Sequence, residues 1–149
     1  MIVVSRYFGE IDYTEDEVLV FPHGLYGFEE EQSFLLLPFS KDGILFGLQS
    51  TKTPELSFTL MHPFSLDPSY APKLQAEDLK ELEAEQSEEL YYYVTCAVKE
   101  PVSESTINMK CPLAINSDTR RGMQVILENS AYGMRHRLSD FARGEGSIC

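Results

Sequence analysis

The sequence predicts a mainly β protein, a small antiparallel β-barrel-like single domain with one short acidic helix. The first observation is a series of short runs rich in β-branched and aromatic residues. The second is the proline and glycine between them, and the third is a two-residue hydrophobic period within several runs. The chain has 149 residues, of which 43% are hydrophobic, which suits one domain with its own core. We therefore expect residues 1–149 to form a single domain.

The predicted strands are nine short segments dominated by apolar residues. They are Ile2–Phe8, Val18–Phe21, Phe34–Phe39, Ile44–Gln49, Phe58–Met61, Leu90–Val98, Thr106–Cys111, Leu113–Asn116 and Met123–Leu127. Apolar and polar residues alternate most regularly in Thr106–Cys111, and every even position of Leu90–Val98 is apolar. This alternation is typical of antiparallel strands with one face on a core. Because no helical crossovers separate the strands, a small barrel or sandwich is favoured.

Helical periodicity is strongest in Ala76–Glu85, where leucines recur three residues apart and two acids occupy the first turn. The other polar positions of this segment are also nearly all acidic. A weaker helical pattern covers Asn129–Phe141, although Gly133 within it disfavours a helix. Residues 143–149, at the end of the sequence, are expected to be frayed.

The formal net charge is −12, and it is unevenly distributed. Residues 1–100 contain 19 acidic and 6 basic side chains, whereas residues 101–149 contain 5 and 6. Such a surface repels nucleic acid and favours a basic protein partner or metal cations. Acidity that serves only to keep the protein soluble is the alternative interpretation. We expect no direct binding of nucleic acid.

Cellular location follows from two features. Neither a signal-peptide pattern nor an apolar run of about 20 residues occurs, so we expect no membrane segment. The cysteines, Cys96, Cys111 and Cys149, are odd in number and widely spaced, which fits free thiols in a reducing cytoplasm. Cys96 and Cys111 lie within apolar runs and are expected in the core.

Catalysis is not expected from this sequence. The histidines, His23, His62 and His136, stand in three separate segments without metal-ligand spacing. No nucleophile elbow, phosphate loop or dinucleotide fingerprint occurs. We therefore predict a protein that is not an enzyme and has no cofactor or metal.

A small-molecule-binding β-barrel protein is the alternative function. The aromatic residues of the predicted strands could line a lumen that holds one ligand. They could equally fill that lumen, and core filling is the commoner use of such side chains.

The stretch from Phe21 to Glu31 contains two glycines three residues apart, followed by three acids. The glycines suit a sharp turn that needs a positive φ or close backbone approach. Phe21 and Phe28 would then be buried against the barrel wall. The acids would emerge beyond this corner as a compact negative patch.

An ordered set of motifs carries a family resemblance. It consists of Gly9-Glu10-Ile11, Phe21-Pro22-x-Gly24-Leu25-x-Gly27-Phe28-Glu29, Leu48-Gln49-Ser50, Leu56-Ser57-Phe58, Pro63, Tyr70, Pro112-Leu113-Ala114-Ile115-Asn116, Arg121-Gly122-x-Gln124-Val125-Ile126-Leu127, Tyr132 and Arg135–Leu138, where x is any residue. In this order and spacing the chain resembles the bacterial flagellar assembly factor FliW family over about residues 6–138. Two departures are Phe46, where the family often has another large aromatic, and the strand ending at His62.

The resemblance implies a non-enzymatic regulator with a small β-barrel-like fold. Members of that family bind the RNA-binding translational repressor CsrA and relieve its repression of flagellin synthesis. They also bind flagellin, so that free flagellin withdraws the antagonist and flagellin translation is coupled to secretion. The expected partners are thus CsrA and flagellin, and the free chain is expected to be a monomer. A strongly negative body docked beside an RNA site would repel phosphates without occupying the site.

The candidate partner-binding residues lie on the corner, on the acidic helix and in three further motifs. They are Leu25, Tyr26, Glu29 and Glu30; Glu77, Asp78, Glu81 and Glu83; and Gln49, Ser50, Asn116 and Gln124. The last four qualify only if their polar groups face outward. Gln49 and Gln124 have a second interpretation, as buried amides that join strand ends or bulges. For flagellin, whose terminal segments form amphipathic helices in its family, apolar pockets are expected.

Overall fold

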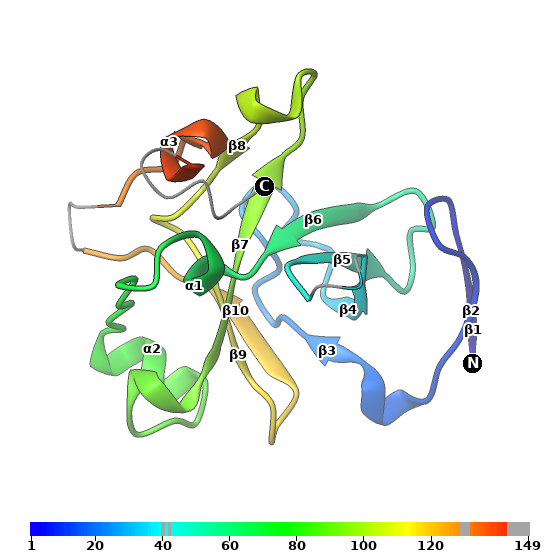
Figure 1. Cartoon of the computed structure of the whole chain (residues 1–149). Helices are drawn as coiled ribbons and strands as arrows, with labels where there is room; N and C mark the ends of the chain where they lie inside the picture. The colour runs from blue at the N-terminus through cyan, green and yellow to red at the C-terminus, as the bar shows by residue number, and fades with distance from the viewer. Residues whose placement is uncertain (40, 42, 129–131, 143–149) are drawn as a thin grey trace.

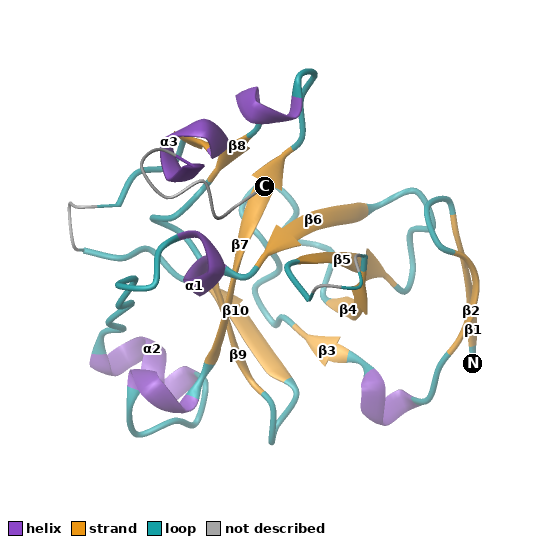
Figure 2. Ribbon diagram, in the orientation of Figure 1, coloured by secondary structure: helices purple, strands orange, loops and turns teal. Residues whose placement is uncertain are grey.

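The structure is a computed structural model that describes residues 1–39, 41, 43–128 and 132–142, and it is mainly β (Figures 1 and 2). The strands are β1 (Ile2–Ser5), β2 (Gly9–Asp12), β3 (Leu19–Val20), β4 (Ser33–Pro38), β5 (Leu45–Ser50), β6 (Ser57–Met61), β7 (Tyr91–Ala97), β8 (Thr106–Ile107), β9 (Leu113–Asn116), β10 (Arg121–Gln124) and β11 (His136–Arg137). Within the described residues the α-helices are α1 (Pro63–Leu66), α2 (Ala76–Glu81) and α3 (Leu138–Ala142). None of them is long and apolar enough to cross a membrane.

Seven strands close into a barrel in the order β3-β4-β5-β6-β7-β9-β10. Six of the seven neighbouring pairs are antiparallel, and β10 returns to β3 through a parallel pairing of Arg121 with Val20. The predicted barrel-like β fold is confirmed, with this one parallel pair as a refinement. The reason is geometric: strand directions cannot alternate all the way around a ring of seven, so one pair must be parallel.

The remaining strands extend from the barrel. β7 continues beyond it and pairs with β8 through Cys96 and Ala97, and β8 pairs with β11. β1 and β2 form a separate antiparallel hairpin on the side of the molecule opposite α2 (Figure 1). Hydrogen bonds of buried polar groups, described below, attach this hairpin to the barrel.

The lumen of the barrel is filled by apolar side chains that alternate along the strands. Its buried members are Leu19, Phe21, Leu25, Phe34, Leu48, Leu60, Leu113 and Ile115. Phe21 and Phe34 meet edge to face with ring centroids 5.6 Å apart, and Phe46 meets Tyr93 in the same way at 5.2 Å. Phe21, Phe34 and Phe46 thus occupy part of the lumen, in line with core filling as the commoner use of such side chains.

A second core covers the outer faces of β7 and β9. The alternate residues of these strands, such as Tyr92 and Ala114, point away from the lumen and pack against Leu66 and Leu82. Tyr70 is buried in the same layer and donates its hydroxyl hydrogen to the carbonyl of Met109 at 2.7 Å. This second core holds α1 and α2 on the barrel.

Several predicted elements differ from the structure at their ends. Ile2–Phe8 is not one strand, because the Ser5 hydroxyl accepts hydrogen bonds from the backbone N–H groups of Tyr7 and Phe8 and turns the chain into β2. The β10 pairing begins two residues before the predicted Met123–Leu127. The α1 helix was not predicted; it begins with Pro63 at its first helical position, where proline is tolerated.

The predicted helices are shorter than their sequence patterns. α2 ends at Glu81 instead of Glu85, because Glu83 adopts a positive φ of 56° and breaks the helix. In the described part of the weak pattern Asn129–Phe141, the helix is α3, which begins at Leu138. Gly133 lies outside it, since its carbonyl accepts backbone hydrogen bonds from the segment after β8. Residues 129–131 and 143–149, with Cys149, lie outside the described residues.

The predicted burial of the other two cysteines is confirmed. Cys111 is only 1% exposed, and Cys96 is partly buried against the outer core. Burial raises the pKa of both thiols, which keeps them protonated at neutral pH. Both are free cysteines.

Candidate functional site

The stretch after β3 folds into a tight corner. Gly24 and Gly27 have φ values of +65° and +89°, in the region that favours glycine. Between them the chain folds back so that Leu25 and Phe28 exchange backbone hydrogen bonds of 3.4 and 2.7 Å. A Cβ on Gly24 would lie 2.5 Å from the Phe28 carbonyl oxygen, whereas one on Gly27 would meet nothing within 4 Å. Position 24 therefore needs glycine because of its positive φ and because the backbone of Phe28 approaches so closely. Position 27 needs glycine only because of its positive φ.

The apolar residues of the corner divide into anchors and exposed groups. Phe21 is fully buried, as predicted, and Leu25 is also buried at 3% exposure. Leu25 therefore offers little exposed surface to a partner, because its side chain packs in the lumen core, and it is accessible only in the lining of the cavity described below. Phe28, expected to be buried, is 43% exposed; its ring meets Phe58 edge to face at 5.0 Å and leaves its other side open. Tyr26 is 54% exposed and remains a candidate.

The three acids after the corner line one surface hollow but differ in their contacts. Glu29 accepts a hydrogen bond from the Gly27 backbone N–H at 3.1 Å, and Glu30 is exposed. Glu31 turns inward and accepts hydrogen bonds from the hydroxyls of Ser50 at 2.6 Å and Thr53 at 2.7 Å. These two bonds, that from Ser50 first, lower the pKa of Glu31. Glu31 thus holds the corner to the β5–β6 turn.

Gln49 and Ser50 are not surface residues. Both have 0% exposure, so their condition for a place in the interface is not met. The Gln49 amide accepts a hydrogen bond from the Ser5 hydroxyl at 2.6 Å and donates to the carbonyls of Ser50 at 3.0 Å and Pro54 at 3.2 Å. The second interpretation of Gln49, a buried amide joining strand ends, is confirmed. This network attaches the β1–β2 hairpin to the barrel.

Asn116 and Gln124 join the corner and α2 to the barrel. The Gln124 amide accepts a hydrogen bond from the Tyr26 backbone N–H at 2.9 Å and donates to the Cys111 carbonyl at 3.2 Å. Asn116 donates to the carbonyl of Leu82, just after α2, at 2.7 Å. Both amides are used inside the molecule, so these residues position the site.

The corner and α2 meet in three dimensions, although about fifty residues separate them in the sequence. His23 Nε2 lies 2.8 Å from a carboxylate oxygen of Glu81, and both side chains are partly exposed. Tyr26 lies close enough to Asp78 for that carboxylate to raise the pKa of the phenol, after the larger effect of burial. We call the surface formed by His23, Tyr26, Glu77, Asp78 and Glu81 the acidic face.

Some candidates lie outside this cluster. Glu29 and Glu30 line a separate surface hollow with Gly27, Phe28 and Glu31. Glu83 is exposed beyond the end of α2, on backbone of positive φ. His23 was missed as a site residue, and its position within the corner motif was the available signal.

Like charges crowd the acidic face. The pKa of Asp78 is raised, first by partial burial and then by the negative charge of Glu77, with a smaller contribution from Glu81. A hydrogen bond involving the Gln75 backbone acts in the opposite direction. The ionised form of Asp78 is thus less stable in the folded chain than in water, and an approaching cationic group would relieve this penalty.

An apolar cavity adjoins the acidic face. It has a volume of about 300 Å³ and shares Tyr26 with that face. Its lining also includes Leu25, Phe58, Thr95, Asn108, Cys111, Gln124 and Met134. Met134 is 54% exposed at the rim, and sequence analysis did not identify it. We call this hollow the corner cavity.

The geometry can be compared with known proteins. A family model described as "FliW protein" matches residues 2–138. The chain belongs to the FliW family. Two relatives named "Flagellar assembly factor FliW", from Syntrophomonas wolfei subsp. wolfei and Geobacillus sp. (strain WCH70), are each 38% identical over 138 residues, 93% of this chain. The match covers 88% of the first relative and 95% of the second.

The fold agrees with a solved FliW structure. A chain described as "Crystal structure of the flagellar assembly factor FliW" superposes with a TM-score of 0.85 at 36% identity, over 93% of this chain and 96% of that one. The resemblance inferred from the motifs is confirmed. The FliW relatives are named as assembly factors and not as enzymes. Among the described residues, no group of three or more His, Cys, Asp or Glu could hold a metal ion.

The two corner glycines should differ in their sensitivity to alanine. Gly27→Ala introduces only left-handed backbone strain, expected to cost about 1 kcal/mol. Gly24→Ala adds an overlap with backbone atoms of Phe28 and Glu29 and should cost at least about 2 kcal/mol. Urea unfolding of the two variants measures both costs. Equal losses would contradict the close approach at Gly24.

Neutralising Asp78 should stabilise the protein. A carboxyl group whose folded pKa is raised destabilises the fold when ionised, so the penalty is present at neutral pH and absent below its ordinary pKa of 3.8. Asp78→Asn should therefore increase the free energy of unfolding at pH 7, and the gain should shrink towards pH 3. Denaturant unfolding across this range tests the prediction, with Asp12→Asn on the exposed hairpin as the control. A loss of stability at pH 7 would contradict it.

Proposed function

We propose that this chain is a non-enzymatic regulator of flagellar assembly that acts in the cytoplasm. In this proposal it binds and antagonises the RNA-binding repressor CsrA, and it also binds flagellin, coupling flagellin translation to secretion. Membership of the FliW family supports the role in flagellar assembly, because its relatives carry that name. We further propose that the free chain is a monomer.

The observation that carries the proposal is the meeting of the corner and α2 in one acidic face. The pair of His23 and Glu81 connects the two elements at 2.8 Å, and Asn116 attaches the end of α2 to the β9–β10 turn. Tyr26 of the corner and the candidates Glu77, Asp78 and Glu81 of α2, which are distant in the sequence, thereby reach a single surface. A basic partner that contacts this surface would compensate several carboxylates at once.

Charge also suggests how antagonism would work. An RNA-binding protein needs a positive surface for phosphates, and RNA affinity falls when negative charge is placed nearby. With a net charge of −12, the chain would repel RNA from CsrA without filling the RNA site. Binding of the two ligands to CsrA would then be coupled by repulsion and not by overlap.

The corner cavity supports the second partner. An amphipathic helix binds through apolar side chains that enter a groove or pocket. The cavity offers about 300 Å³ beside exposed Tyr26 and Met134. Because Tyr26 belongs to both surfaces, flagellin seated there would compete with CsrA for this side chain. The withdrawal of the antagonist by flagellin would follow from that competition.

Neutralising the acidic face should weaken CsrA binding. We expect the double variant Glu77→Gln/Glu81→Gln to bind purified CsrA about tenfold less tightly and with a smaller salt dependence. The matched control is Glu10→Gln/Glu55→Gln, which removes two exposed charges outside the acidic face. Isothermal titration calorimetry at low and high salt provides the measurement, repeated with flagellin present, which should abolish binding.

Three results would contradict parts of this proposal. No binding of the natural sequence to CsrA or flagellin would reject both partners. Equal weakening by the two double variants would remove the acidic face as the contact surface. Simple competition between RNA and this chain for CsrA would reject repulsion as the mechanism.

A further inference from the structure

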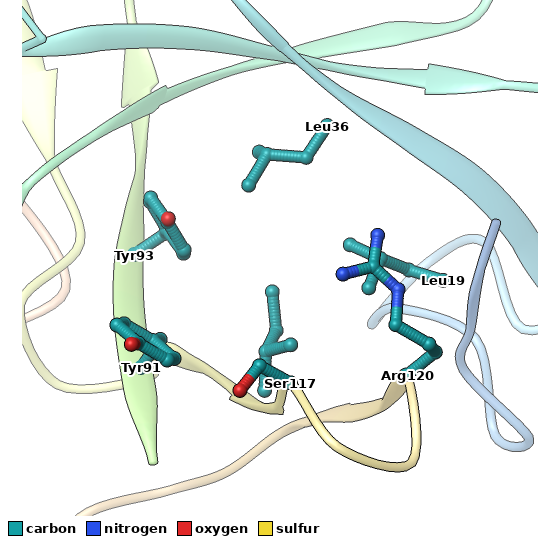
Figure 3. Close-up of a pocket in the computed structure, with 7 residues that line it drawn as sticks. Leu19, Leu36, Tyr91, Tyr93, Ser117 and Arg120 are labelled. Carbon is teal, nitrogen blue, oxygen red and sulfur yellow. The ribbon is translucent and has the colours of Figure 1, made fainter. Parts of the chain in front are cut away.

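A third cavity opens at the mouth of the barrel, away from the proposed partner surfaces. It has a volume of about 200 Å³ and shares no residue with the acidic face or the corner cavity. Its lining comes from β3, β4, β7, β9 and the β9–β10 turn, and comprises Leu19, Leu36, Tyr91, Tyr93, Ile115, Ser117 and Arg120 (Figure 3). The residues surround an open centre, so the cavity is built by the closed barrel itself.

The base of this cavity is apolar and its rim is polar. Leu19, Leu36 and Ile115 come from the lumen core and supply hydrocarbon surface. Tyr91 and Ser117 are exposed at the rim, and their hydroxyls form no hydrogen bond with any described residue. A ligand that fits would therefore have an apolar body and a polar end directed outward.

Arg120 determines the charge of that polar end. Its guanidinium lies at the side of the cavity, with a nitrogen directed towards the open centre (Figure 3). Of its five N–H donors, one is used in a 2.9 Å hydrogen bond from Nη2 to the Glu17 carbonyl. Nε is buried and has no acceptor, and no described carboxylate lies within ion-pair distance of this side chain. An arginine that forms no ion pair with a described carboxylate is unexpected in a chain of net charge −12.

The backbone holds Arg120 in place at a cost. Its φ is +59°, a left-handed conformation that glycine or asparagine would adopt more easily. Its N–H donates to the Asn116 carbonyl at 2.9 Å, and its carbonyl accepts from the Val20 N–H at 2.8 Å. Both hydrogen bonds are formed by the backbone, so any residue at position 120 could form them. Arginine at this position is thus explained by its side chain and not by the turn.

The size of the cavity limits the body of the ligand. An apolar cavity of about 150 Å³ is large enough for benzene in another protein. About 200 Å³ therefore accommodates an aromatic ring or a branched aliphatic group with a short chain. The acidic surface of the chain and the carboxylate of nearby Asp16, which interacts electrostatically with Arg120, would repel ligands with several negative charges. A single carboxylate is the charge that this site tolerates.

We propose that the barrel mouth binds a small monocarboxylate with an aromatic or branched aliphatic body. The body lies against Leu19, Leu36 and Ile115, and the carboxylate accepts charge-assisted hydrogen bonds from Arg120. This site is separate from the surfaces proposed for CsrA and flagellin, and it does not depend on that function.

The test uses 3-phenylpropionate as the probe and its neutral analogue 3-phenylpropanamide as the comparison. Titrated to about 10 mM, the acid should raise the melting temperature of the full chain by mass action and change its tyrosine fluorescence, because Tyr91 and Tyr93 line the cavity. The amide should do neither. Arg120→Gln should bind the acid at least about tenfold more weakly. Arg121→Gln, which loses the same charge from the adjacent residue, should bind it as the natural sequence does.

The proposal is overturned if the acid does not bind, if acid and amide bind equally, or if Arg120→Gln binds as well as Arg121→Gln. The comparison of acid and amide needs no variant, so it decides the matter even if Arg120→Gln fails to fold. Circular dichroism establishes whether each variant is folded.

Discussion

The closure of the barrel between β3 and β10 is the constraint on which the remaining structure depends. It consists of a single parallel register position, Arg121 with Val20, and includes a 2.8 Å hydrogen bond from the Val20 N–H to the Arg120 carbonyl. So short a pairing needs support from packing. Phe21 provides it, since its buried ring lies where a Cβ on Gly122 would be, 2.6 Å from the nearest ring carbon. The absence of a side chain at Gly122 lets the two strands approach over an aromatic ring.

Part of each functional region lies within a few residues of that closure. On one strand the corner begins directly after Phe21. On the other, Gln124 accepts the Tyr26 N–H and fixes the exposed end of the corner. Arg120, immediately before β10, directs its side chain to the barrel mouth. The junction thus positions the corner, which contributes to the acidic face and the corner cavity, and it positions Leu19 and Arg120 of the mouth cavity.

The sequence predicted what depends on local patterns. Alternating apolar residues placed most strands correctly, and the two glycines predicted a corner of positive φ, since both signals depend on near neighbours. What it did not predict depends on distant partners. Glu31 appeared to be a surface acid, but hydroxyls about twenty residues away turn it inward. Leu25 appeared exposed beside Tyr26, yet the lumen takes its side chain.

The candidate site was predictable in part for the same reason. The corner and the acidic helix were each identified, but nothing local could indicate that His23 would reach Glu81. The parallel closure was also hidden, because it follows from the number of strands in the ring. Gln49 had two interpretations in the sequence, and only the position of Ser5 decides between them.

The central claim is that the packing of Phe21 under Gly122 fixes the corner. The direct measurement is the hydrogen-exchange rate of the Tyr26 amide in the Gly122→Ala variant. Gly47→Ala is the control, because a Cβ at position 47 would also meet an aromatic ring, that of Phe8, at 2.4 Å. The account predicts that both variants lose stability and that only Gly122→Ala markedly accelerates exchange at Tyr26. Equal exchange at Tyr26 in variants of similar stability would contradict it.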